Sequence, residues 1–226
     1  KFFQNHGLFK LKNRPQWYTV SNRSRTYVNK IISQISGEHY KNYKVTKIKR
    51  KSPGIDLYYG GDNEYFDYDK VVFACHADET LKIINDPTEN EKKILSNFKY
   101  KNNIAYLHND TNLMPKHLSA WSSWNSILDS TDLNKNCFTY WLNKLQNLET
   151  KNNFFLTLNP IEVIEKKKII RKIEFTHPFY DEKTTKAQLR LNELQGVNNS
   201  WFCGSYFGYG FHEDGLKSGM YVASKL

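Results

Sequence analysis

The chain has 226 residues and a mass of 26.7 kDa, and 39% of its residues are hydrophobic and 15% aromatic. This length and composition suffice for a sizeable core and exclude a largely disordered chain. The formal net charge is +10, but Arg supplies only 6 of the 33 basic residues. Because nucleic-acid readers favour Arg at base edges and phosphates, we expect no nucleic-acid partner.

The cysteines are too few and too widely spaced for a disulfide framework or a CxxC metal clip. They are Cys75, Cys137 and Cys203. His108 and His117 lie near Asp110 in the sequence, but their spacing matches no familiar zinc pattern, so we expect no metal site. No apolar run reaches the roughly 20 residues that a membrane-spanning helix needs. A reducing, cytoplasmic location is the simplest interpretation.

The first hundred residues predict a mixture of strands and helices. Alternating apolar residues indicate strands, and isoleucines at helical spacing after Ser21, a suitable cap, indicate a helix. A β-branched run that ends at Ala74 is typical of a strand buried on both faces. The predicted strands are 8–11, 16–20, 45–48, 55–59 and 70–74, and the predicted helices are 22–36, 77–84 and 88–96.

From about residue 100 the pattern changes to successive strands joined by loops rich in Asn, Asp, Thr and Pro. Several strands with few helices between them favour an antiparallel sheet. A helix over 182–194, closed by Gly196, then leads to a short buried strand over 201–203 and a last helix over 212–225. The predicted strands of the sheet are 103–108, 119–126, 137–143, 154–158 and 169–176.

The most informative segment joins the last strand to the last helix. The strand ends at Gly204, and Gly208 and Gly210 precede a helix that begins near His212. Glycines let a backbone approach a ligand closely, and a helix start presents N–H groups with a partial positive charge. Such a junction suits a phosphate, or a carbonyl that gains electrons. The alternative is a plain glycine-rich turn before a terminal helix.

Further motifs are spread along essentially the whole chain. They are NHGL at 5–8, RPQW at 14–17, SRTYV at 24–28, VVFACHAD at 71–78, LMP at 113–115, AWSSWN at 120–125, YWLN at 140–143, TLNP at 157–160 and HP at 177–178. Together with 201–219, they resemble the flavin-containing amine oxidase superfamily. The closer resemblance is to bacterial NAD/FAD-binding, amine-oxidase-like proteins that are often associated with cyclopropane-fatty-acid synthases.

The resemblance implies a mixed α/β (α+β) fold, with an antiparallel substrate-domain sheet and an incomplete FAD/NAD(P)-binding domain. Family members begin with a strand–GxGxxG–helix unit, and this chain has none and begins with Lys1 rather than Met. We therefore expect a fragment, the C-terminal half of a longer flavoprotein, with the missing N-terminal FAD-binding half as its partner. The expected segments are substrate-domain 1–20, FAD-domain 21–99, substrate-binding 100–179 and C-terminal FAD-domain 180–226.

Matching positions imply cofactor contacts at both ends of a dinucleotide. The backbone of Val45 matches the position that pairs with the adenine end, and Ala74 and Cys75 follow the strand that comes near the pyrophosphate. Gly204 and Ser205 match the strand end near the ribityl chain and phosphate.

At the start of the last helix, His212 and Glu213 match the residues whose N–H groups face the flavin C2 carbonyl, and Phe211, which directly precedes them, is a further expected cofactor contact. A helix dipole placed there would stabilise reduced flavin.

The sequence also departs from the family pattern. Ser205 stands where an acidic residue usually follows the strand-end glycine. No cysteine corresponds to the one that carries flavin covalently in monoamine oxidases, so FAD is expected to bind noncovalently. The lysine that positions water near flavin N5 is missing from the strand around 102–106. True amine oxidation is therefore not expected, and no catalytic residue is assigned.

The expected function is hydride transfer from a substrate to flavin N5, with a lipid or fatty-acyl chain ranked above a small amine. We expect the fragment alone to lack FAD and activity. Trp121, Trp124 and Trp141 either pack in the core or line an apolar pocket. A homodimer and a peripheral membrane contact are further expectations. The alternative is a non-catalytic basic module that binds an acidic partner or nucleic acid.

Overall fold

The computed structural model describes residues 10–13, 16, 18, 20–60, 64–128 and 136–226. The chain divides into two compact units, Lys1–Lys41 and Asn42–Leu226. In the first unit, helix α2 spans Ser24–Gln34 and buries none of its side chains. Ser21 does not cap it as predicted, because Arg23 occupies the N-cap position without a side-chain hydrogen bond. The predicted strands 8–11 and 16–20, and the motifs at 5–8 and 14–17, lie wholly or partly outside the described residues.

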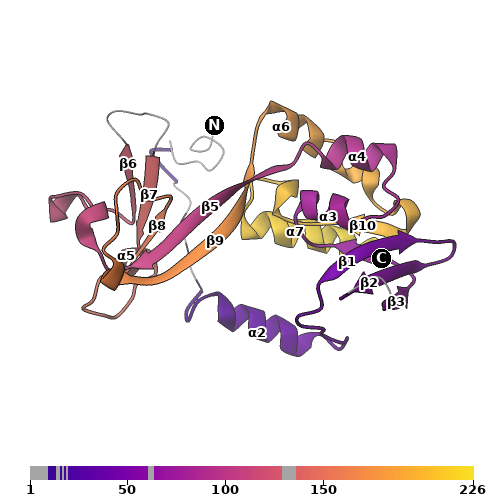
Figure 1. Cartoon of the computed structure of the whole chain (residues 1–226), viewed down its shortest axis with the longest axis horizontal. Coiled ribbons are helices and arrows are strands. Elements are labelled where there is room, and N and C mark those ends of the chain that lie inside the picture. Colours follow the sequence, from indigo (N-terminus) through magenta and orange to yellow (C-terminus); the bar gives the residue numbers. More distant parts are fainter. Residues whose placement is uncertain (1–9, 14–15, 17, 19, 61–63, 129–135) are drawn as a thin grey trace. The chain divides into compact units, whose positions relative to one another are not determined.

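The second unit begins with a three-stranded antiparallel meander in the order β1-β2-β3 (Figure 1). The strands are β1 (Val45–Arg50), β2 (Ile55–Tyr59) and β3 (Tyr65–Tyr68). Ile48 and Ile55 turn inward from this sheet and are almost fully buried. Asp56, next to Ile55 in β2, is buried as well, so burial along β2 does not strictly alternate.

A second, two-stranded sheet pairs segments far apart in the sequence. Strands β4 (Val71–Phe73) and β10 (Ser200–Phe202) are parallel, with Phe73 opposite Phe202. The two phenylalanine rings stack with centroids 5.1 Å apart and form part of the main core. The larger helices of the second unit are α3 (Ala77–Ile83), α4 (Glu89–Leu95), α6 (Glu182–Gln188) and α7 (His212–Ala223).

A buried ion pair joins the meander to α4. The Arg50 guanidinium donates to both carboxylate oxygens of Glu91, at 2.6 and 3.0 Å, and both side chains are nearly excluded from solvent. Glu91 also accepts from the backbone N–H of Thr88, whose hydroxyl caps α4. One carboxylate thus fixes both the helix start and the end of β1.

The third sheet has five antiparallel strands in the order β6-β7-β8-β5-β9. They are β5 (Lys99–His108), β6 (Trp124–Leu128), β7 (Asn136–Trp141), β8 (Phe155–Leu158) and β9 (Ile169–Phe179), with the short helix α5 (Leu142–Leu145) after β7. This arrangement confirms the predicted mixed fold and its antiparallel sheet. Along β7, Cys137 and Thr139 are buried while Phe138, between them, is exposed.

Two predicted elements end or begin elsewhere because side chains and tight turns interrupt them. The helix predicted over 182–194 divides into α6 and a 3-10 turn over Leu191–Leu194, because Arg190 N–H bonds to Ala187 O and tightens the backbone. The strand predicted from residue 119 starts only at Trp124. Before it, the Asn125 amide accepts from Ser122 N–H and donates to Ser122 O, which holds a turn.

Every helix within the described ranges is too short or too polar to cross a membrane.

Candidate functional site

The carboxyl ends of β4 and β10 lie side by side. Cys203 N–H donates to Phe73 O at 3.0 Å, just where both strands finish. Beyond that point, a Cβ built on Gly204 would lie 3.8 Å from Cys75 O. The structure therefore brings together four of the predicted cofactor residues. They are Cys75 and Gly204, together with Ala74 and Ser205, which adjoin them in the chain. In open parallel sheets, ligands bind outside such carboxyl ends.

Gly204 is required by its surroundings. Its φ of 153° is one that other residues rarely adopt, and a Cβ there would lie 2.7 Å from the ring of Tyr206. The Ser218 hydroxyl of α7 accepts from Gly204 N–H at 2.9 Å and donates to Gly215 O at 2.8 Å. These bonds fix α7 against the end of β10.

Tyr206 places a polar atom in the core beside this strand end. Its side chain is only 3% exposed, and its hydroxyl has no hydrogen-bond partner among the described residues. Burial raises the pKa of Tyr206 well above its ordinary value, so the phenol stays protonated and can donate. A buried hydroxyl left unpaired costs about 1–3 kcal/mol, so it marks a place for a ligand atom or a water.

Burial keeps two ionisable groups near Tyr206, the Tyr100 phenol and the Cys203 thiol, in their neutral forms. Burial raises the pKa of Tyr100 to about 12, and its hydroxyl accepts from Ala77 N–H at 3.1 Å. The Tyr100 ring stacks on His76 with centroids 4.1 Å apart. Burial likewise raises the pKa of the Cys203 thiol. A thiol kept protonated is a poor nucleophile, which favours a packing role for Cys203 over covalent catalysis.

The carboxylate of Asp214 lies at the start of α7 and accepts backbone hydrogen bonds there. One oxygen of Asp214 accepts from the N–H groups of Tyr209 and Phe211, at 2.9 and 3.0 Å. His212 and Glu213 follow and are exposed rather than packed in the core, and Glu213 pairs with Lys217 at 3.4 Å. The helix start is thus accessible from solvent, and its contact with a flavin stays a prediction.

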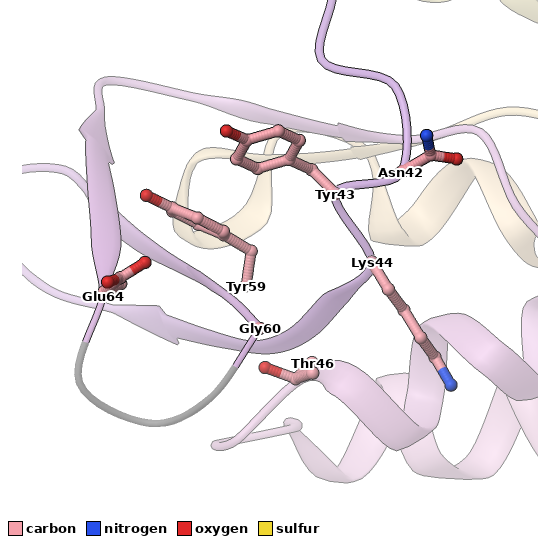
Figure 2. A pocket seen from close by; sticks show the side chains of 7 residues that line it. All are labelled: Asn42, Tyr43, Lys44, Thr46, Tyr59, Gly60 and Glu64. Atoms are coloured by element: carbon pink, nitrogen blue, oxygen red, sulfur yellow. The ribbon is translucent and has the colours of Figure 1, made fainter.

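Val45 opens β1, where it pairs with Tyr59, and it packs against the core that contains Phe73 and Phe202. Its pairing with an adenine also stays a prediction. An open hollow of about 490 Å³ lies on the same strands and is lined by none of the eight predicted cofactor residues (Figure 2). There the rings of Tyr43 and Tyr59 lie with centroids 4.9 Å apart, and Lys44 points away from them.

The five-stranded sheet contains a buried polar chain rather than a reactive site. His108 Nδ1 accepts from Asp110 N–H at 3.1 Å, which assigns the ring proton to Nε2, and Nε2 donates to Thr157 Oγ1 at 2.8 Å. Thr157 in turn bonds to Thr139 at 2.8 Å. Across the described residues, no group of three or more His, Cys, Asp or Glu is arranged to hold a metal.

Four residues around the strand ends were not predicted as site residues: Gln195, Tyr206, Asp214 and Ser218. Only Asp214 had a signal, since an acidic residue in the first turn of a helix is a common cap. The others act through contacts that form only on folding: the Gln195 side chain accepts from Phe202 N–H and donates to Phe202 O, and the Ser218 hydroxyl accepts from Gly204 N–H.

No family model matches the sequence, and no curated protein matches it. Solved structures do match. The CLA-producing fatty acid isomerase from P. acnes shares 12% identity and a TM-score of 0.62, over 89% of this chain and 51% of that chain. Putrescine oxidase bound to putrescine shares 10% identity and a TM-score of 0.62, over 90% and 52%. Cyclohexylamine oxidase from Brevibacterium oxydans IH-35A shares 10% and 0.53, over 81% and 47%.

This likeness establishes the fold of the chain, which is that of part of an amine-oxidase-like structure. The chain spans about half the length of the solved structures that it matches.

Proposed function

We propose that this chain is part of a flavin-dependent oxidoreductase that binds FAD noncovalently at the carboxyl ends of β4 and β10. The observation that carries the proposal is the junction at Gly204. At this junction β10 is followed by Gly204, a position that only glycine fits. Gly204 is hydrogen-bonded to α7 and lies beside the buried, unpaired hydroxyl of Tyr206. The amine-oxidase-like fold and the matching sequence motifs support the same assignment.

The residues at this junction fit a dinucleotide. Gly204 would let the backbone approach a phosphate, and the protonated Tyr206 phenol would donate to a cofactor oxygen. His212 and Glu213 would present the first N–H groups of α7. When bound, FAD would supply the acceptor for a hydride from the substrate, while the protein binds and orients both.

The substrate that we propose is a lipid or fatty-acyl chain rather than a small amine. Directly paired residues of an antiparallel sheet share a face, and this relation puts Trp124, Phe138 and Phe175 on one face of the five-stranded sheet. These three side chains are 42–50% exposed. An apolar surface suits an acyl chain better than an ammonium group. One structural neighbour is itself a fatty acid isomerase.

The test is to express the continuous reading frame that contains these residues, with its flanking coding sequence, and to record flavin absorbance after reconstitution with FAD. The unmodified protein is expected to be yellow. Gly204→Ala should lose the flavin, because the new Cβ meets Tyr206. Gly219→Ala is the matched control in α7, since a Cβ there meets nothing within 4 Å. A colourless unmodified protein would contradict the proposal.

A basic binding module is the second candidate, and the distribution of charge favours it. The unit Lys1–Lys41 contains eight basic residues and one acidic residue, a large part of the net charge of +10. Such a module would bind an acidic partner with an affinity that falls steeply as salt rises. Heparin binding that does not change with salt would exclude it.

A further inference from the structure

A basic cleft lies between α4 and α6, which contact each other (Figure 1). Its volume is about 210 Å³. The residues that α6 and the turn after it contribute follow the i, i+3, i+4, i+7 spacing of a single helix face. The lining residues are Lys93, Ile94 and Asn97 from α4 and the turn after it, and Lys183, Lys186, Ala187 and Arg190 from α6 and the turn after it.

Two hydrogen-bonded links fix the walls of the cleft. Near the start of α6, the buried Thr184 hydroxyl donates to Asn97 O at 3.0 Å. Past the end of α6, the Arg190 guanidinium donates to Asn90 Oδ1 and to the Glu193 carboxylate, both at 2.8 Å. The cleft is therefore formed in advance, and a ligand that enters it has little backbone to order.

The cleft carries a surplus of positive charge. Its lining includes four cations and, within the described residues, no acidic side chain. Lys186 and Arg190 each pair with one neighbouring carboxylate. Lys93 and Lys183 form no ion pair within the part of the chain that the structure describes. Four cations against two carboxylates leave two positive charges without a counterion from this chain.

The floor of the cleft is apolar. Ile94 and Ala187 meet there and are buried, whereas Lys93, Lys183 and Lys186 around them are exposed. A cationic rim above an apolar floor suits an anion that is attached to a small apolar group. Pockets for drug-sized ligands measure about 300–1,000 Å³, so the ligand of this cleft is smaller than those.

We propose that the cleft binds a small organic phosphate monoester. Lys93 and Lys183 would hold the phosphate, and the organic group would cover the apolar floor. A phosphate monoester carries a charge of about −1.5 to −2 at pH 7, which matches the surplus of the cleft. Its oxygens accept charge-assisted hydrogen bonds from ammonium groups. None of the eight predicted cofactor residues lines the cleft, so this site is separate from the proposed flavin site.

The test titrates phenyl phosphate, by calorimetry at low salt, into the protein expressed with its flanking coding sequence. The unmodified protein should show saturable binding. The double variant Lys93→Gln, Lys183→Gln should bind at least about tenfold more weakly, because two charge-assisted hydrogen bonds are lost. Lys92→Gln is the matched control on α4, since Lys92 pairs with Glu89 in solvent and does not line the cleft. It should change the affinity by less than about twofold.

Three further probes define the ligand. Inorganic phosphate should bind more weakly than phenyl phosphate because it leaves the apolar floor uncovered, and benzoate should bind more weakly because it carries one charge. Phosphatidate in phosphatidylcholine vesicles offers the same phosphate as a lipid headgroup, and these vesicles should not displace phenyl phosphate.

Three results would overturn the inference. They are no saturable binding of phenyl phosphate, an equal loss of affinity in Lys92→Gln, and displacement of phenyl phosphate by the vesicles. Because none of these measurements involves flavin, they are independent of whether the longer protein binds FAD.

Discussion

The five-stranded antiparallel sheet and the two-stranded parallel sheet differ in how they satisfy their polar groups. In the larger sheet, His108, Thr157 and Thr139 form a continuous chain of hydrogen bonds. Beside the smaller sheet, the hydroxyl of Tyr206, in the turn after β10, has no partner within the described residues. One region completes its own hydrogen bonding, and the other leaves a polar group that a ligand or a water can satisfy.

The largest expected effect concerns the frame around the parallel sheet. Glu91→Ala leaves the Arg50 guanidinium buried without its main anion, which should lower the free energy of unfolding by about 3–5 kcal/mol. Glu89→Ala is the control, because its pair with Lys92 is exposed to solvent and should contribute little to stability. Urea unfolding measures both variants. Similar losses in the two would show that Arg50 finds other partners.

The next effect tests whether the larger sheet is complete as described. Thr157→Val removes the hydroxyl between His108 and Thr139 and leaves both side chains without that bond, so it should cost about 1–3 kcal/mol in urea unfolding. Thr185→Val, which loses only an exposed bond to Asp181 O, should cost much less. A neutral Thr157→Val would mean that the chain of bonds contributes nothing to stability.

A pH dependence follows from the same histidine. Burial lowers the pKa of His108 in the folded state, so the unfolded chain binds more protons as the pH falls below about 6.5. The contribution of His108 is complete above that pH and declines as the pH falls toward the folded pKa, with a slope of at most about 1.4 kcal/mol per pH unit. Denaturant midpoints across this range should vary less in His108→Gln. An identical pH profile in the variant would refute the assignment.

The smallest effect is that of Tyr206→Phe, which should be favourable in the flavin-free chain and unfavourable in the flavin-loaded protein. Tyr206→Phe removes an unpaired buried hydroxyl, so the flavin-free chain should gain about 1 kcal/mol of stability. In the longer, flavin-loaded protein the same change should weaken FAD binding about fivefold to tenfold, because a hydrogen bond is lost. Thermal shifts and flavin titration measure these effects. A loss of stability without flavin would show that the hydroxyl already has a partner, such as a water.

Sequence patterns predicted the elements whose residues repeat locally. The alternation in β1 and β2, the β-branched run of β4 and the antiparallel strands were confirmed. Predictions were wrong where a few side-chain or turn bonds decide the backbone, as at Asn125 and Arg190. Propensity averages over a window and does not register such single bonds.

The candidate site divides in the same way. Gly204 could be found because a glycine at a strand end is informative by itself. Gln195 and Tyr206 could not, because their roles depend on which strand edge and which core space they meet after folding. A glutamine and a tyrosine are common residues with many uses, so neither is a local signal.

The hydrogen bonds between the Gln195 side chain and the Phe202 backbone also limit how copies of this chain can aggregate. An endless fibril built through a sheet requires two complementary borders on every molecule. In this sheet the edge of β10 is occupied by the Gln195 side chain of the same molecule. Assembly through the sheet therefore stops once two molecules have paired through their remaining edges.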